Sequence, residues 1–235
     1  MVLAHKAFFG ASIQEIGRMA AAGDVVAEAA GSDRAVDVAA SGADFTLFSF
    51  YKVYGPHFAV MVGRYDQLLE LDGLYHYFYG RERVPHKLEP GNVSYEAAWS
   101  CTAIVDYVEA LGGGRGRPAI EAAFALMAEQ EEALSRRLLD GLSGLRGLRV
   151  VGSRDPDRAV RVPTVCFKAE GRDAADIVRH VDAAKVGIRH GDFHSRRLVE
   201  ALGLADRNGV LRASLVHYNT LAEVDRLLEA LDAAL

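Results

Sequence analysis

The spacing of apolar residues divides the first half of the chain into helical and extended segments. Residues 13–20 and 95–111 carry apolar side chains at helical spacing. Strand-like runs occupy residues 24–29, 44–50 and 57–64, and the last two of these flank a sharp turn. This half therefore combines strands with helices.

The second half begins with a long amphipathic helix, predicted for residues 119–142, after which the period changes. Strands are predicted at 148–153, 161–169 and 209–219, and helices at 174–184 and 221–235. Strands that alternate with helices indicate an α/β or α+β layered architecture. We place a domain boundary near residue 142, so that residues 1–142 form a first domain with a linking helix and residues 143–235 a smaller one.

Composition narrows the functional classes. The 235 residues carry a net charge of −5, which provides no basic surface for nucleic acid or anionic membranes. No apolar run approaches the ~20 residues that cross a bilayer, and the start of the chain lacks a convincing signal peptide. Cys101 and Cys166 stand far apart, which favours a reducing compartment and argues against structural zinc. We expect a cytoplasmic protein.

Lys52 lies in the unusual stretch "FSFYKVYGPH", where a lysine interrupts an aromatic run just before a Gly-Pro turn. In one interpretation its stem lies on the aromatic residues while its amine reaches water. In the other, a desolvated amine with a lowered pKa acts as a nucleophile towards a carbonyl. Lys52 alone does not decide between them.

The residues around Lys52 form an ordered motif. Asp44-Phe45, Ser49, Lys52 and Gly55-Pro56 follow one another in "DFTLFSFYKVYGPHFAVMVGR". This segment resembles the Schiff-base segment of class V aminotransferase-like enzymes of fold type I, the pyridoxal-phosphate group that contains the cysteine desulfurases.

Two further segments extend the resemblance. "LEPGNVSYEAAW" is similar to a family segment in which Asn92 follows a Glu-x-Gly motif. Downstream, Arg189 lies in an Arg-x-Gly turn, and Arg212 in an Arg-x-Ser strand that leads to Tyr-Asn-Thr at 218–220. The resemblance implies an α/β fold: the C-terminal part of the fold-type-I transferase fold, with a partial large domain and a small α+β C-terminal domain.

The resemblance also implies a role for each matched residue. Lys52 would form the Schiff base with pyridoxal 5'-phosphate and move protons at the substrate Cα. Ser49 and Tyr51 would hold the phosphate, and Asn92 would reach the partner's cofactor in a homodimer. Arg212 would grip the α-carboxylate of an amino-acid substrate, next to Arg189. The aromatic residues around Lys52 would exclude water and favour its neutral amine.

The chain departs from the family pattern at two places. His194 occupies the position at which the desulfurases carry a reactive cysteine, so it is assigned to the substrate site but cannot form a persulfide. Val26 falls where the family has an aspartate for the pyridine nitrogen, and Asp24 and Glu28 flank it. His190, His194 and His217 have no ligand-spaced partners, so no metal site is predicted.

These observations predict a pyridoxal-phosphate-dependent enzyme that acts on an amino acid. Transamination, racemisation and elimination remain open as reactions. The alternative is a catalytically inactive, truncated homologue that only folds or dimerises. In either case we expect the isolated chain to bind the cofactor weakly, with poor activity.

Overall fold

The computed structural model describes residues 2–4, 26–29, 35, 37–73, 78–89 and 91–235, which form two compact units. The units are Met1–Phe124 and Ala125–Leu235. The helix predicted for residues 13–20 and the side chain of Asp24 lie outside the described residues. The division into domains 1–142 and 143–235 stays a prediction.

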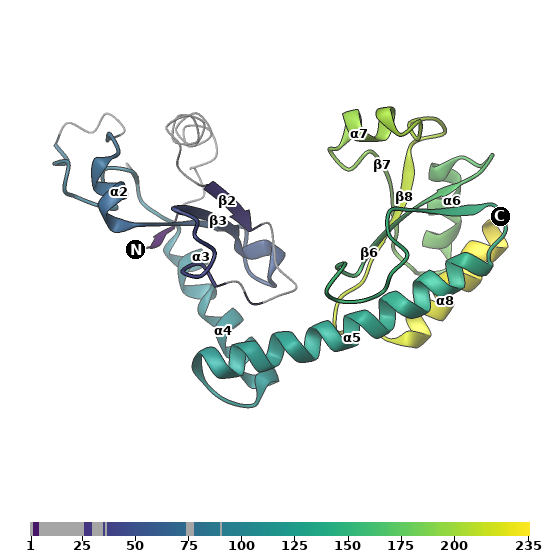
Figure 1. Cartoon of the computed structure of the whole chain (residues 1–235), viewed down its shortest axis with the longest axis horizontal. Coiled ribbons are helices and arrows are strands. Elements are labelled where there is room, and N and C mark those ends of the chain that lie inside the picture. Colours follow the sequence, from purple (N-terminus) through teal and green to yellow (C-terminus); the bar gives the residue numbers. More distant parts are fainter. Residues whose placement is uncertain (1, 5–25, 30–34, 36, 74–77, 90) are drawn as a thin grey trace. The chain divides into compact units, whose positions relative to one another are not determined.

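The first unit contains a four-stranded sheet in the order β1-β4-β3-β2. Figure 1 labels β2 and β3 of this sheet. Its strands are β1 (Val2–Ala4), β2 (Val26–Ala29), β3 (Phe45–Ser49) and β4 (Ala59–Gly63). β2 runs parallel to β3, whereas β4 is antiparallel to both β3 and β1. The three predicted strands are confirmed, and β1 is an addition that the sequence pattern missed.

One apolar cluster of this unit joins β3 and β4 to the helix α2 (Tyr65–Glu70). Phe45, Met61, Leu68 and Leu88 are all buried in it. Lys87 is buried beside them, and its Nζ donates to the main-chain oxygens of Leu69 (2.8 Å) and Leu71 (2.7 Å). A lysine that binds the last carbonyl groups of a helix satisfies acceptors that lack a partner within the helix. Lys87 therefore stabilises the end of α2.

The single helix predicted for residues 95–111 is two helices. α3 (Tyr95–Ser100) and α4 (Thr102–Gly112) meet at Cys101. Ser94 caps α3 through its hydroxyl, and Gly113, with φ of 71°, ends α4 in the left-handed conformation that favours glycine. Trp99 is exposed in this unit, so the apolar side predicted for this segment is not wholly buried.

The helix α5 (Gly116–Gly144) is 29 residues long and contributes to both units. Its composition is rich in Ala, Leu, Glu and Arg, which are good helix formers. Buried residues recur every three or four positions along it. They include Ala119, Ala123, Met127, Leu134, Leu138 and Leu142. The prediction of a long amphipathic helix is confirmed.

The second unit is an antiparallel sheet in the order β5-β6-β8-β7. Its strands are β5 (Leu148–Val151), β6 (Thr164–Ala169), β7 (Arg189–Gly191) and β8 (Val210–Ser214). Its helices, besides α5, are α6 (Ala174–Ala183), α7 (Arg196–Ala201) and α8 (Leu221–Ala234). Of these, β7 and α7 were not predicted.

The two faces of this sheet differ in chemistry because side chains alternate along a strand. One face carries Val165, Phe167, Leu211 and Ala213, which are buried in a cluster with residues of α5, α6 and α8. On the other face Cys166 lies opposite Arg212. The packed face therefore builds the core, and the opposite face presents polar chemistry.

Candidate functional site

Lys52 ends the turn that follows β3. The chain turns through a short 3-10 helix, η1 (Phe50–Lys52), and the main-chain oxygen of Phe50 accepts from the amides of Val53 and Gly55, both at 2.9 Å. A Cβ on Gly55 would lie 2.9 Å from this oxygen, so only glycine fits without a shift. The Gly-Pro sequence thus fixes where the lysine projects.

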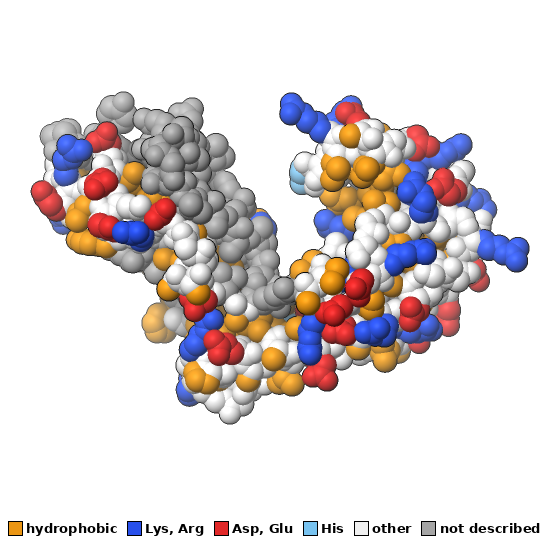
Figure 2. All heavy atoms as spheres, viewed as in Figure 1, with side chains coloured by type: hydrophobic (Ala, Val, Ile, Leu, Met, Phe, Trp, Pro, Cys, Tyr) orange, Lys and Arg blue, Asp and Glu red, His pale blue; other side chains and the backbone are white. Residues whose placement is uncertain are grey.

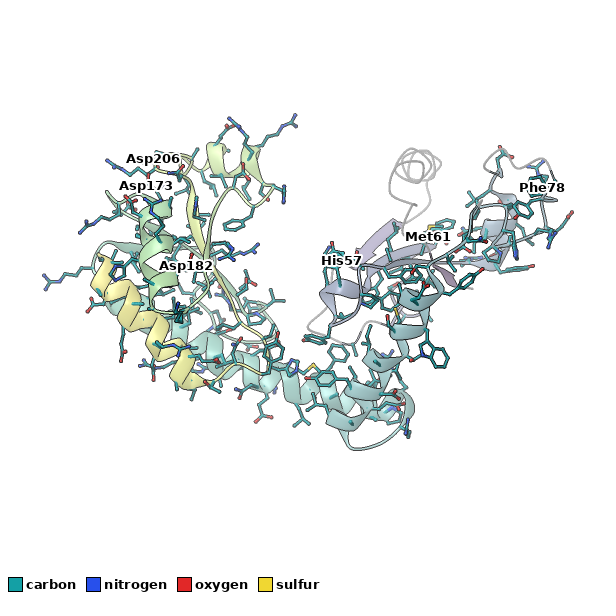
Figure 3. All side chains as sticks on the ribbon, turned by 180° about the vertical axis from the view of Figure 1, so that it is seen from behind. His57, Met61, Phe78, Asp173, Asp182 and Asp206 are labelled. Carbon is teal, nitrogen blue, oxygen red and sulfur yellow. The ribbon has the colours of Figure 1, made fainter. Side chains whose placement is uncertain are left out.

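The Lys52 side chain is exposed. Its Nζ lies 5.5 Å from the ring centroid of Tyr51, and it makes no hydrogen bond or ion pair within the described part of the chain. Tyr51 is itself 46% exposed and stacks on His57, which is labelled in Figure 3. The expectation that aromatic residues shield Lys52 from water is therefore not met among the residues that the structure describes.

The aromatic residues of the motif pack against one another instead. Phe50 contacts Phe48 edge-on, with ring centroids 5.3 Å apart, and stacks on Phe58 at 6.1 Å. Phe58 is buried, and Phe48 and Phe50 are half-buried, whereas Lys52 lies at the surface.

The other motif residues of this unit lie on different elements. Ser49, the last residue of β3, is buried, and its hydroxyl does not cap η1. Asn92 is exposed on the segment that precedes α3. Ser49 and Tyr51 are thus close to Lys52 along the chain, whereas Asn92 is held by a separate segment.

Arg212 and Arg189 are brought together in the second unit. They are directly opposite each other in the β7–β8 register, and Cys166 is opposite Arg212 on its other side. Residues directly opposite in a sheet project from the same face. The sheet order therefore aligns three residues that are far apart in the sequence.

The two arginines differ in what they contact. Arg189 Nη1 donates to the oxygen of Ile188 at 2.7 Å and lies 4.0 Å from Asp182 Oδ1. The Cζ of Arg212 lies 4.2 Å from the ring centroid of Phe193. No hydrogen bond or ion pair of Arg212 occurs among the described residues, so its donors are available for an anion.

His194 is exposed on the loop between β7 and α7. Its amide donates to Asp192 Oδ1 at 3.0 Å, and its φ is 64°. The preceding residue, Phe193, also has a left-handed backbone and is the residue of this site that the sequence reasoning missed. Its position in the loop carries no motif that would have marked it.

Neither cysteine has the surroundings of a reactive thiolate. Cys166 lies in β6, as predicted, whereas Cys101 lies at the junction of α3 and α4. Burial raises the pKa of both thiols above its ordinary value, and for Cys166 the nearby Arg212 and Arg161 oppose this effect less strongly. Protonated thiols are poor nucleophiles.

No group of three or more His, Cys, Asp or Glu residues in the described part of the chain could hold a metal ion. No helix of that part is both long and apolar enough to cross a membrane.

The profile of the family "Aminotransferase class-V" matches residues 11–227, which is most of the chain. The chain belongs to the class V aminotransferase family. Its members include cysteine desulfurases and depend on pyridoxal phosphate.

Several class V relatives resemble the chain over most of its length. "Aminotransferase-like protein FGM3" of Gibberella zeae is 41% identical over 204 residues, which are 86% of this chain and 48% of that protein. "Cysteine desulfurase-like protein ustD" of Aspergillus flavus is 31% identical over 85% of this chain and 44% of its own length. A probable cysteine desulfurase of Pseudomonas putida is 34% identical over 85% of this chain and 47% of its own length.

Solved structures give the same result. The cysteine desulfurase CsdA of Escherichia coli matches with a TM-score of 0.72 at 25% identity, over 93% of this chain and 53% of that one. A cysteine desulfurase of Thermococcus onnurineus matches with a TM-score of 0.73 at 24% identity, over 94% of this chain and 55% of that one. At this identity the match is evidence for a shared fold only. The class V chain therefore has part of the fold-type-I fold and spans about half the length of these relatives.

The described residues of this class V chain fit part of the family's cofactor. An amine at a fixed turn, with no acid partner among the described residues, suits the cofactor aldehyde. In the β2–β3 pairing, Val26 is opposite Phe45, and valine provides no carboxylate for a pyridine nitrogen at that position. The exposed amine of Lys52 thus suits the reactive end of the cofactor, whereas the predicted aspartate position carries no charge.

Proposed function

We propose that this chain provides the C-terminal part of a pyridoxal-phosphate-dependent enzyme, cysteine desulfurase-like or class V aminotransferase-like, that acts on an amino acid. Lys52 is the lysine that carries the cofactor. The observation that supports this most directly is the amine of Lys52, projected by a Gly-Pro turn and without an acid partner among the described residues. An amine without a structural partner is available to react with the cofactor aldehyde.

The remaining residues are assigned around Lys52 and the substrate. Ser49 and Tyr51 hold the phosphate by hydroxyl donation. Arg212 binds the substrate α-carboxylate, because a guanidinium with free in-plane donors matches two carboxylate oxygens. Arg189 and His194 lie on the neighbouring strand and loop and complete the substrate side. We further propose a homodimer in which Asn92 reaches the partner's site.

The reaction begins at the substrate Cα. The bound cofactor supplies an electron sink for the electron pair left at this carbon. Lys52 removes the Cα proton and returns a proton to the substrate. Transamination, racemisation and β- or γ-elimination share this first removal, and all three suit the residues present. Because position 194 is a histidine, release of sulfur through a persulfide at that position is not part of the proposal.

A second candidate function is that of a catalytically inactive homologue that folds or dimerises. Val26, at the position predicted for the aspartate, favours it, because the loss of a charged hydrogen bond costs about 1.5–3 kcal/mol of cofactor binding. The two candidates differ in whether Lys52 reacts with the cofactor.

Borohydride reduction in the presence of pyridoxal phosphate tests the proposal. We expect one pyridoxyl group on Lys52, located by peptide mapping, and a visible absorption band that Lys52→Gln abolishes. Lys185 provides the matched control, since it is also exposed, and Lys185→Gln should keep both signals. Equal labelling of Lys52 and Lys185, or no visible band at saturating cofactor, would favour the inactive homologue.

A further inference from the structure

The loop between β7 and α7 has a costly backbone. Phe193 and His194 have φ values of 51° and 64°, a left-handed region that side chains other than glycine rarely adopt. Asp192 holds the loop in this form: its Oδ1 accepts from His194 N at 3.0 Å, and its main-chain oxygen accepts from Ser195 N at 2.9 Å. Residues kept in such conformations often serve a site.

The strained backbone places the Phe193 ring between two environments. The ring packs against the apolar cluster of Val199, Leu204 and Val210, which joins α7 to β8. The guanidinium of Arg212 lies over the ring, 4.2 Å from its centroid to Cζ. Figure 2 shows hydrophobic side chains gathered on the C-terminal unit next to α7. The Phe193 ring is thus held in place by its packing against this apolar cluster.

Among the described residues, Arg212 contacts the Phe193 ring and makes no hydrogen bond through its N–H groups. Arg161 shows the opposite case: its Nη1 donates to Ser153 O at 2.8 Å and its Nη2 to Thr164 O at 2.7 Å. Arg212 has no such acceptor among the described residues. A guanidinium that stacks on an aromatic ring keeps its in-plane N–H groups free for a bidentate carboxylate.

We propose that Phe193 is a positioning residue that holds the Arg212 guanidinium flat on its ring, ready to bind a carboxylate. That this carboxylate belongs to the amino-acid substrate rests on the function proposed above. Pre-ordering matters because an arginine side chain otherwise loses rotamer freedom when it binds its ligand.

The test uses the full chain, labelled with ¹⁵N-arginine, and acetate as the probe, without pyridoxal phosphate. Arg212→Lys assigns the Arg212 Nε–Hε resonance by its loss. We expect Phe193→Leu, which keeps an apolar side chain, to weaken acetate binding by about 2- to 30-fold and to remove the ring-current shift of Arg212. This range corresponds to a cation–π contribution of about 0.5–2 kcal/mol. Phe193→Tyr should restore both signals.

Val199→Ala is the matched packing control, because it trims the same cluster without removing the ring. We expect it to leave acetate affinity near that of the wild type. An unchanged affinity in Phe193→Leu, an equal loss in Val199→Ala, or no response of Arg212 to acetate would each overturn the proposal. Acetate binding needs no cofactor, so failure of Lys52 labelling would leave this result standing, and the reverse also holds.

Discussion

At the scale of single residues, the lysines differ in what their ammonium groups contact. Lys87 and Lys168 are buried, and both donate to main-chain oxygens. Lys52 is exposed and without such a partner among the described residues. Lys168 in "CFKAEG" and Lys52 in "FYKVYG" stand in similar apolar surroundings along the chain, so local sequence does not separate their roles. Only the ordered motif around Lys52, with its Ser-x-x-Lys and Gly-Pro spacing, distinguishes Lys52 from Lys168 in the sequence.

The thiols give a prediction at the same scale. Because burial raises the pKa of Cys166 above that of an ordinary thiol, the group is protonated at neutral pH. We expect its alkylation by iodoacetamide to be slower than that of free cysteine at pH 7, and to keep rising with pH beyond the range in which free cysteine levels off. Mass spectrometry of the Cys166 peptide measures this rate.

With pyridoxal phosphate and L-cysteine, the same peptide maps should show no persulfide on Cys166 or Cys101. Rapid alkylation at pH 7, or a persulfide that builds up during turnover, would show that a buried thiol replaces the missing cysteine at position 194.

At the scale of elements, α8 begins with a complete capping box. Thr220 Oγ1 accepts from Glu223 N at 3.2 Å, and Glu223 Oε2 accepts from Thr220 N at 2.8 Å. We predict that Thr220→Ala lowers the free energy of unfolding by ~1 kcal/mol, because one helix donor loses its partner. Ser195→Ala is the matched control, since Ser195 precedes α7 without a side-chain cap. Urea unfolding measures both variants, and equal losses would contradict the prediction.

A second prediction for an element concerns the turn before β8. Lys168 Nζ lies 2.9 Å from Asp206 Oδ1, and this hydrogen bond lowers the pKa of the Asp206 carboxyl group below its usual value. A depressed pKa in the folded state contributes stability above the pKa of the unfolded chain, and this contribution is lost as pH falls through the folded pKa. We therefore expect Asp206→Asn to remove part of the acid-induced loss of stability.

Asp182→Asn provides the comparison, because Asp182 is 4.0 Å from the arginine nearest to it. Figure 3 labels both aspartates, which lie at different places on the C-terminal unit. Unfolding midpoints measured between pH 7 and acid pH should converge for wild type and Asp206→Asn as pH falls. Parallel curves for the two proteins would refute the assignment.

The elements that the sequence predicted are those in which apolar residues repeat at helical or strand spacing over several turns or residues. The strands β3, β4, β6 and β8 and the helices α5, α6 and α8 were all expected, although β8 ends at Ser214, earlier than predicted. Short elements were missed, because the three residues of β7 or the six of α7 show too few repeats of any period. The break at Cys101 has no sequence signal such as proline or glycine.

Only the residues of the candidate site that belong to sequence motifs could be predicted. Lys52, Arg189 and Arg212 were identified by motif, but their roles stay predictions. The alignment of Cys166, Arg212 and Arg189 depends on β8 lying between β6 and β7, an order that differs from the order along the chain. The contact between Arg212 and the Phe193 ring depends on the left-handed backbone of Phe193. Phenylalanine rarely adopts this conformation, so the sequence does not predict it.

At the scale of the whole molecule, the apolar clusters formed by the described residues differ in size between the two units. Among these residues, the cluster between the second sheet and its helices contains 20 buried hydrophobic residues, whereas the cluster around Phe45 contains four. Because hydrophobic burial dominates local stability, we predict that amides of β6 and β8 exchange with solvent more slowly than those of β3 and β4. Hydrogen exchange followed by mass spectrometry tests this. Equal protection of the two sheets would indicate one cooperative unit.

The length of α5 has a consequence for synthesis on the ribosome. Its later turns carry Leu134, Leu138 and Leu142, which share a core with α8, and a Cβ on Gly141 would clash with the Leu228 side chain. Translation at about 5–20 residues per second separates these two helices by roughly 5–20 seconds. During that interval the leucine stripe has left the ribosome without the helix that covers it. The leucine stripe of α5 is therefore without its α8 neighbours until synthesis of the chain is nearly finished.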